Sequence, residues 1–211
     1  MDGLLVTIEG GEGAGKTTQS GLLADALAGR GFDVLRTREP GGAPGAEALR
    51  RFLLAGDHRL SRRAEAMAHY AARFDHVDNT IRPALAAGRM VLCDRYADST
   101  LAYQGYGLAQ GEPDVLAFIA RLDALLDVRP HLTLVLDVAR AEGLHRLRQR
   151  GGDADRYETL DDAFHERVAA GYRSIAKAHP VRCRLIPAGG AVETVHRRML
   201  EAVLAAVPPG R

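Results

Sequence analysis

The chain has 211 residues, of which 46% are hydrophobic and 26% charged. These proportions are typical of a globular domain with a buried core, and they exclude collagen-like, disulfide-scaffold and disordered proteins. The 28 Lys and Arg residues nearly balance the 27 Asp and Glu residues, so the formal charge is +1. Such a balance provides no broad positive field that would attract nucleic acid or an anionic membrane.

The cysteines and the N-terminus indicate the compartment. Cys93 and Cys183 lie in apolar surroundings without the spacing of a disulfide motif or a zinc site, so we interpret them as reduced core residues. No apolar run approaches the length of a membrane span. The start Met1-Asp2 lacks the basic segment of a signal peptide. These observations predict a cytoplasmic protein that binds neither membrane nor nucleic acid.

Short apolar segments alternate with helical patterns along the chain. The strands are expected at 4–8, 34–35, 90–93, 132–136 and 184–186. Helical periodicity is clearest at 22–27, 46–54, 62–87 and 192–207. This alternation predicts an α/β fold in which a five-stranded parallel sheet carries helices on both faces. We expect residues 1–211 to form a single domain.

A phosphate-binding loop follows the first expected strand. Residues 10–17 read GGEGAGKT, which matches G-x-x-x-x-G-K-[ST] without adjustment. Glycines let the backbone N–H groups turn toward phosphate oxygens, and the next helix adds the positive end of its dipole. In this pattern Lys16 bridges the β- and γ-phosphates, and the Thr17 hydroxyl binds Mg²⁺. The expected ATP-binding residues are Gly10, Gly11, Glu12, Gly13, Ala14, Gly15, Lys16, Thr17 and Thr18.

Two classes of P-loop protein compete: phosphotransferases, and nucleotide-dependent switches or motors. A guanine-reading Asn-Lys-x-Asp motif is absent, because the only asparagine, Asn79, is not followed by lysine. Charged residues follow three of the strands, namely Arg38, the pair Asp94-Arg95, and the arginines of 146–156. The carboxyl ends of parallel strands form the ligand-binding edge of such a sheet. Converging arginines suit a reaction between two anionic nucleotides, which favours a kinase.

At this point the chain resembles thymidylate kinase, the family that phosphorylates dTMP with ATP. The resemblance rests on segments 8–18, 37–42, 70–73, 94–96, 99–105 and 155–158, which follow the family's order and span most of the chain. It implies the nucleoside monophosphate kinase fold, Mg²⁺, a homodimer, and the reaction ATP + dTMP → ADP + dTDP of dTTP biosynthesis. Two alternatives stay open: a kinase for another monophosphate such as uridylate or guanylate, and a regulator that hydrolyses ATP slowly.

The resemblance assigns the catalytic and metal-binding residues. Asp94 would hold Mg²⁺ together with Thr17, unless it only caps the next helix. Lys16 and Arg95 would contact the phosphates where donor and acceptor meet.

In one branch of the family a basic residue of the P-loop assists the transfer. This P-loop has no basic residue before Lys16, so the resemblance implies that the catalytic cation comes from elsewhere. We expect it from a mobile lid at about 143–158, similar to the bacterial-type lid. Arg150 and Arg156, which flank Gly151-Gly152, are the candidates.

The phosphate and sugar of dTMP are assigned to the loops around the P-loop. Arg38 would grip the phosphate, since a guanidinium can bind two oxygens. Arg50 would help unless it lies on a solvated helix face, and Glu39 would shape the loop through a cis bond to Pro40. Glu12 would accept a hydrogen bond from the sugar 3′-OH. The full dTMP set is Glu12, Arg38, Glu39, Arg50, His69, Arg73, Arg95, Thr100, Tyr103, Gln104, Asp155 and Tyr157.

By the same resemblance Arg73, Thr100 and Gln104 would read the thymine by hydrogen bonds, with Tyr103 packed beside them. Tyr157 and Asp155 would lie where the 2′-OH of a ribose would project. No motif identifies the residues that read adenine, and the loop 187–189 is expected there on position alone.

His69 departs from the family, which usually has a phenylalanine that stacks on thymine at this position. We expect the neutral imidazole of His69 to stack instead, with Tyr70, Phe74 and Tyr103 as alternative stacking rings. The KM for dTMP should then rise as the pH falls through about 6.5, the ordinary pKa of histidine.

Overall fold

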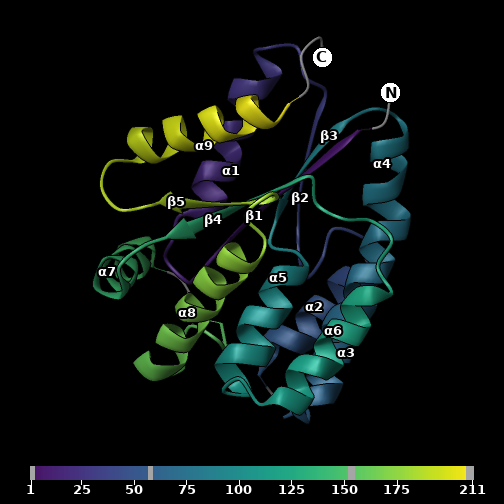
Figure 1. Cartoon of the computed structure of the whole chain (residues 1–211), viewed down its shortest axis with the longest axis vertical. Helices are drawn as coiled ribbons and strands as arrows, with labels where there is room; N and C mark the ends of the chain where they lie inside the picture. The colour runs from purple at the N-terminus through teal and green to yellow at the C-terminus, as the bar shows by residue number, and fades with distance from the viewer. Residues whose placement is uncertain (1–2, 57–58, 152–154, 208–211) are drawn as a thin grey trace.

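The structure, a computed structural model, describes residues 3–56, 59–151 and 155–207. Five parallel strands form one sheet in the order β2-β3-β1-β4-β5 (Figure 1). The strands are β1 Leu4–Gly10, β2 Val34–Arg38, β3 Met90–Asp94, β4 Leu132–Asp137 and β5 Cys183–Pro187. All five expected strands are confirmed. Each extends beyond its apolar run, because backbone pairing continues to the polar edge of the sheet.

Helices cover both faces of this sheet. One face carries α1 Lys16–Ala28 and α9 Val192–Ala206 (Figure 1). The other carries α3 Arg62–His76, α5 Ala97–Thr100, α6 Pro113–Ala124 and α8 Asp162–Ala178. The remaining helices are α2 Pro44–Ala55, which packs on α3, α4 Arg82–Ala86, and α7 Arg140–Arg150, which lies beside α8. The predicted α/β fold is therefore confirmed.

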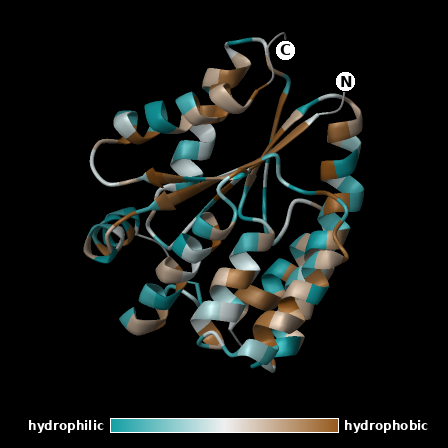
Figure 2. Ribbon diagram, in the orientation of Figure 1, coloured by the Kyte–Doolittle hydropathy of each residue, from teal (hydrophilic) through white to brown (hydrophobic). Residues whose placement is uncertain are grey.

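The strands divide their side chains between two cores. Val6 and Leu92 pack with the α1 and α9 side, whereas Leu5 and Val91 pack with α3 and α6. Successive residues of a strand point to opposite faces, so a sheet covered on both sides needs continuously apolar strands. Figure 2 shows this apolar character along the strands.

The helix expected at 62–87 is continuous but not uniform. Its middle, η1 Val77–Ile81, is π-helical, and α4 begins directly after it. Pro83 lies in the first turn of α4 and has no N–H to donate to the preceding turn. A second π-helical segment, η2 Leu101–Leu108, continues α5. Such segments are frequent at functional sites, and η2 carries Tyr103 and Gln104.

No helix in the described part of the chain is both long enough and apolar enough to cross a membrane.

Candidate active site

The loop between β1 and α1 has the backbone that a phosphate cradle requires. Gly10, Gly13 and Gly15 all have positive φ, of 140°, 75° and 87°, a region that glycine enters without a steric penalty. A Cβ on Gly13 would also collide with the backbone of Gly143 on α7. The cradle and the first residues of the expected lid are thus in direct backbone contact.

Lys16 folds back over this loop. Its Nζ is buried and donates hydrogen bonds to the carbonyl oxygens of Gly10 and Gly11, at 3.1 and 2.9 Å. Burial, and then the nearby Arg95, lower the pKa of Lys16, while Glu12 and Asp94 oppose that shift. The ammonium group is therefore placed at the cradle by neutral backbone acceptors, which an incoming phosphate can replace.

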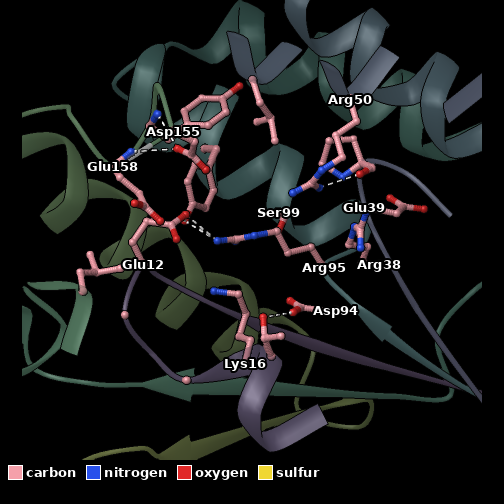
Figure 3. Close-up of a pocket in the computed structure, with 18 of the residues that line it drawn as sticks. Glu12, Lys16, Arg38, Glu39, Arg50, Asp94, Arg95, Ser99, Asp155 and Glu158 are labelled. Atoms are coloured by element: carbon pink, nitrogen blue, oxygen red, sulfur yellow. Dashed lines mark hydrogen bonds and ion pairs between the residues drawn. The ribbon is translucent and has the colours of Figure 1, made fainter. Parts of the chain in front are cut away.

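Two oxygen atoms that could bind a metal ion lie close together beside Lys16. The Thr17 hydroxyl donates a hydrogen bond to Asp94 Oδ2 at 3.0 Å, although 77 residues separate them in the sequence (Figure 3). Asp94 is the last residue of β3, and Thr17 is the second residue of α1. The parallel sheet therefore brings them together.

Arg95 occupies the centre of the site (Figure 3). Its φ is 70°, in the left-handed region that costs a non-glycine residue about 1 kcal/mol or more. The backbone N–H of Arg95 donates to the carbonyl of Ile8 at 2.9 Å, which holds this conformation. Burial alone would lower the pKa of Arg95, but Tyr103 and Glu12 raise it well above its ordinary value. The guanidinium is a permanent cation in a fixed place.

Glu12 is bound to Arg95 rather than directed at the phosphate cradle. Its Oε1 accepts hydrogen bonds from Arg95 Nη2 and from the Tyr103 hydroxyl, both at 2.6 Å. Burial would raise the pKa of Glu12, but Arg95 and Lys16 lower it to about 2. Among the described residues nothing donates to its second oxygen, Oε2.

A buried layer beneath Arg95 was not predicted from the sequence. Arg95 Nη1 donates to Ser99 and Tyr172, and both of these hydroxyls bond to Glu9, which is fully buried. Burial, and then Asp98, raise the pKa of Glu9 to about 7. Glu9 and Ser99 lie within the segments of the resemblance, but Tyr172 belongs to no motif and reads as a core residue of α8.

The residues expected to hold the acceptor phosphate lie across the cavity from the P-loop (Figure 3). Arg38 is exposed and paired with Glu47 at 3.1 Å, and Arg50 Nη1 donates to the carbonyl of Pro40 at 2.8 Å. The Glu39–Pro40 bond is cis, as expected. The Arg38 guanidinium thus faces solvent beside a loop of fixed shape.

The residues expected to read the base form a buried set with one unused donor. Arg73 Nε donates to Glu39 at 2.7 Å, and Nη2 donates to Thr100 Oγ1 at 3.1 Å. Arg73 Nη1 is buried and has no partner among the described residues. A buried guanidinium N–H without an acceptor is costly, so this atom could bind an acceptor atom of a ligand.

His69 lies in the cavity, and its surroundings oppose the ionisation that we expected near pH 6.5. The ring is 9% exposed, and its Nε2 lies 3.1 Å from the Tyr157 hydroxyl. Burial, and then the positive charge of Arg73, lower the pKa of His69 to about 3. The side chain therefore stays neutral where we expected it to ionise near pH 6.5.

The expected lid arginines are bound to carboxylates. Arg150 Nη2 lies 2.9 Å from both oxygens of Glu158, and Arg156 Nη2 donates to Glu65 Oε2 at 2.8 Å. Arg146 donates to the carbonyl of Ala188, which lies in the loop expected to meet adenine. Residues 152–154, which include Gly152, lie outside the described residues.

One cavity of about 560 Å³ joins these groups. Its lining includes most of the predicted residues: Glu12, Gly13, Gly15, Lys16, Thr17, Thr18, Arg38, Glu39, Arg50, His69, Arg73, Asp94, Arg95, Thr100, Tyr103, Gln104, Arg150, Asp155 and Tyr157. Four of the predicted residues, all within the described part of the chain, do not line it: Gly10, Gly11, Ala14 and Arg156. Arg156 instead reaches Glu65, a buried carboxylate that no sequence motif singled out.

Comparison with known proteins gives one consistent family. Residues 8–199 match the family model described as thymidylate kinase. A thymidylate kinase of Gluconobacter oxydans is 56% identical over 95% of this chain and 94% of its own, and that of Caulobacter vibrioides is 48% identical over 96% of each. The crystal structure of thymidylate kinase from Ehrlichia chaffeensis superposes with a TM-score of 0.74 at 33% identity, covering 96% of this chain and 99% of its own.

Proposed function

The chain belongs to the thymidylate kinase family and transfers the γ-phosphoryl group of ATP to dTMP, and we propose that its cavity holds the two nucleotides end to end. ATP lies over residues 10–18, and dTMP lies between Arg38 and Gln104. Residues 1–211 act as one domain whose α7 end closes over the phosphates.

One observation carries this placement: a single continuous cavity has the P-loop on one side and the acceptor residues on the other. Thr17 and Thr18 line it together with Arg38 and Arg73, and Arg95 stands between the two sets (Figure 3). The donor and acceptor phosphates therefore meet beside Arg95 and Lys16.

The residues at this meeting point need to supply position and charge rather than a proton acceptor. A phosphate monoester is already ionised near neutral pH, so the attacking oxygen carries its own charge. Lys16 and Arg95 hold that oxygen and the γ-phosphoryl group in line and neutralise charge as it shifts. Arg150 reaches the same charge when it leaves Glu158.

The Thr17–Asp94 pair suits Mg²⁺. A hydroxyl and a carboxylate oxygen 3.0 Å apart are the hard ligands that this ion prefers beside nucleotide phosphates. When bound there, the ion would neutralise negative charge on the β- and γ-phosphates.

The remaining parts of dTMP follow from the free atoms of the cavity. Arg38 and Arg50 face the phosphate, and Glu12 Oε2 is available to the sugar 3′-OH. Arg73 Nη1 is placed for a carbonyl of the base, His69 and Tyr103 flank the ring, and Thr100 and Gln104 complete the pocket. Tyr157 and Asp155 close its sugar side.

A homodimer is also part of the proposal. It rests on the resemblance to the thymidylate kinase family. Sedimentation should then give twice the 22.7 kDa mass of the chain. The cytoplasm is the proposed location, in keeping with the free, buried cysteines Cys93 and Cys183.

The role of Glu12 provides the test of this placement. We would measure kcat/KM for dTMP and for 3′-deoxy-TMP in the wild type and in Glu12→Gln. The wild type should prefer dTMP by about 10-fold or more, because a hydrogen bond to a charged group contributes about 1.5–3 kcal/mol. The preference should shrink in Glu12→Gln. An equal preference in both proteins would show that the sugar 3′-OH does not bind Glu12.

A further inference from the structure

Glu65 on α3 binds three side chains that come from different parts of the chain. It is 3% exposed. Its Oε1 accepts hydrogen bonds from Gln104 Nε2 at 3.0 Å and from the Tyr157 hydroxyl at 2.8 Å, and its Oε2 accepts from Arg156 at 2.8 Å. The carboxylate therefore joins the base-reading helix η2 to the segment that follows α7.

These bonds determine which end of the Gln104 amide is bound. A carboxylate only accepts hydrogen bonds, so the amide must present its NH₂ group to Glu65. The same nitrogen also donates to the Tyr157 hydroxyl at 2.9 Å. The NH₂ group of the amide is thereby bound within this cluster. Its acceptor, Oε1, receives no hydrogen bond from any described residue and remains for a ligand in the cavity that Gln104 lines.

The same reasoning fixes the state of His69. The Tyr157 hydroxyl has one hydrogen, which it donates to Glu65, so its other neighbours must donate to it. His69 Nε2, at 3.1 Å, therefore carries a hydrogen, and the neutral ring has its proton on that atom. Every hydrogen bond in this cluster thus follows from the negative charge of Glu65.

We propose that Glu65 is a positioning residue that sets the hydrogen-bond polarity of the base pocket. Through it, Gln104 offers an acceptor while Arg73 Nη1 offers a donor. A pyrimidine with a 4-carbonyl group and an N3–H satisfies both. Cytosine presents a 4-amino group and an unprotonated N3, so it fails at both atoms. The inference rests on the placement of dTMP proposed above.

Substituting Glu65 by glutamine tests this directly. If the new amide oxygen keeps Arg156, its NH₂ faces Gln104, which must then turn its own oxygen inward and its NH₂ toward the base. We would measure kcat/KM for dTMP and dCMP in both proteins. A site built on hydrogen bonds discriminates by about 10⁴-fold, and the dTMP/dCMP ratio should fall at least about 30-fold in Glu65→Gln.

The distribution of the loss separates a positioning role from a merely structural one. The KM for dTMP should rise more than kcat falls, and kcat/KM for dCMP should stay equal or increase. A uniform loss on both substrates, with the ratio unchanged within about 3-fold, would overturn the proposal. Glu112→Gln is the matched control, because Glu112 pairs with Arg62 on the surface and should leave the ratio unchanged.

Two further variants cover other results. If Glu65→Gln does not fold, Glu65→Met removes the acceptor that orients the Gln104 amide and should lower the ratio in the same direction; an unchanged ratio there would overturn the proposal. Gln104→Met removes the amide itself. A changed ratio in Gln104→Met with none in Glu65→Gln defeats only the role of Glu65, whereas no change in Gln104→Met defeats the placement of the base as well.

Discussion

The P-loop cations and the lid cations of the cavity are held in different ways. Lys16 is buried and the Arg95 side chain is only 16% exposed. The partners of both include backbone carbonyls of the P-loop itself. Arg150 has a side chain that is 56% exposed and pairs with the carboxylate of Glu158, which is not part of the loop. The charges of Lys16 and Arg95 are therefore in place before a nucleotide binds. The charge of Arg150 is neutralised by Glu158 until a phosphate competes for it.

This difference indicates which cations of the site can move during the reaction cycle. Dipoles and cations fixed before the reaction need no reorganisation while charge shifts. A lid cation must leave and return with each cycle, so an exposed and exchangeable ion pair suits it better than a buried one. Arg156, whose partner Glu65 is buried, is the less movable of the two lid arginines.

The largest loss of activity should come from substituting Lys16, one of the fixed cations. Lys16→Ala should lower kcat/KM for dTMP phosphorylation by about 10³-fold, because the charge beside the γ-phosphate is lost. The thermal midpoint should stay nearly unchanged, since Lys16 bonds only to carbonyls that water can reach once the side chain is gone. Lys177→Ala is the matched control, as the only other lysine is exposed on α8. Activity above a tenth of wild type in Lys16→Ala would contradict the P-loop assignment.

Substituting the lid arginines should have a smaller effect, on kcat for one arginine and on KM for the other. Arg150→Ala should lower kcat by about 10²-fold with little change in the dTMP KM, as expected for a cation that acts on the transition state. Arg156→Ala should instead raise the dTMP KM, because it leaves the buried Glu65 without its ion-pair partner. Steady-state kinetics of both variants and of Arg148→Ala, an exposed control, would decide. The reverse pattern would make Arg156 the mobile cation.

The smallest effect concerns the pH dependence of the base pocket. His69→Phe should give a dTMP KM profile parallel to wild type from pH 5.5 to 8, because a ring with a pKa of about 3 binds no proton there. The ionisation of dTMP itself is common to both proteins. A wild-type KM that rises more steeply below pH 6.5 than that of the variant would show that His69 ionises.

The pH dependence of thermal stability should also report the low pKa of His69. The unfolded ring binds a proton below about pH 6.5 and the folded ring does not, so folding loses free energy as the pH falls below that value. Between pH 6.5 and 5 the thermal midpoint of wild type should therefore fall further than that of His69→Phe. Equal slopes would place the pKa of His69 near its ordinary value.

Local patterns were sufficient for the frame of the molecule. The five strands, the P-loop and the polar residues at strand ends could all be predicted, because each depends on residues close in sequence. Strand ends such as Arg38 and Asp94 must share one edge once the strands are parallel, so their meeting could also be anticipated.

Partners and burial were decided by the tertiary structure alone. Nothing near Arg156 indicates that it would bond to Glu65, 91 residues away, or that Tyr172 would support Arg95. The low pKa of His69 likewise arises from helices that exclude water and from Arg73 beside it. A sequence specifies which side chains can donate, accept or carry charge. Which of them meet, and whether water remains between them, is set only when distant elements pack.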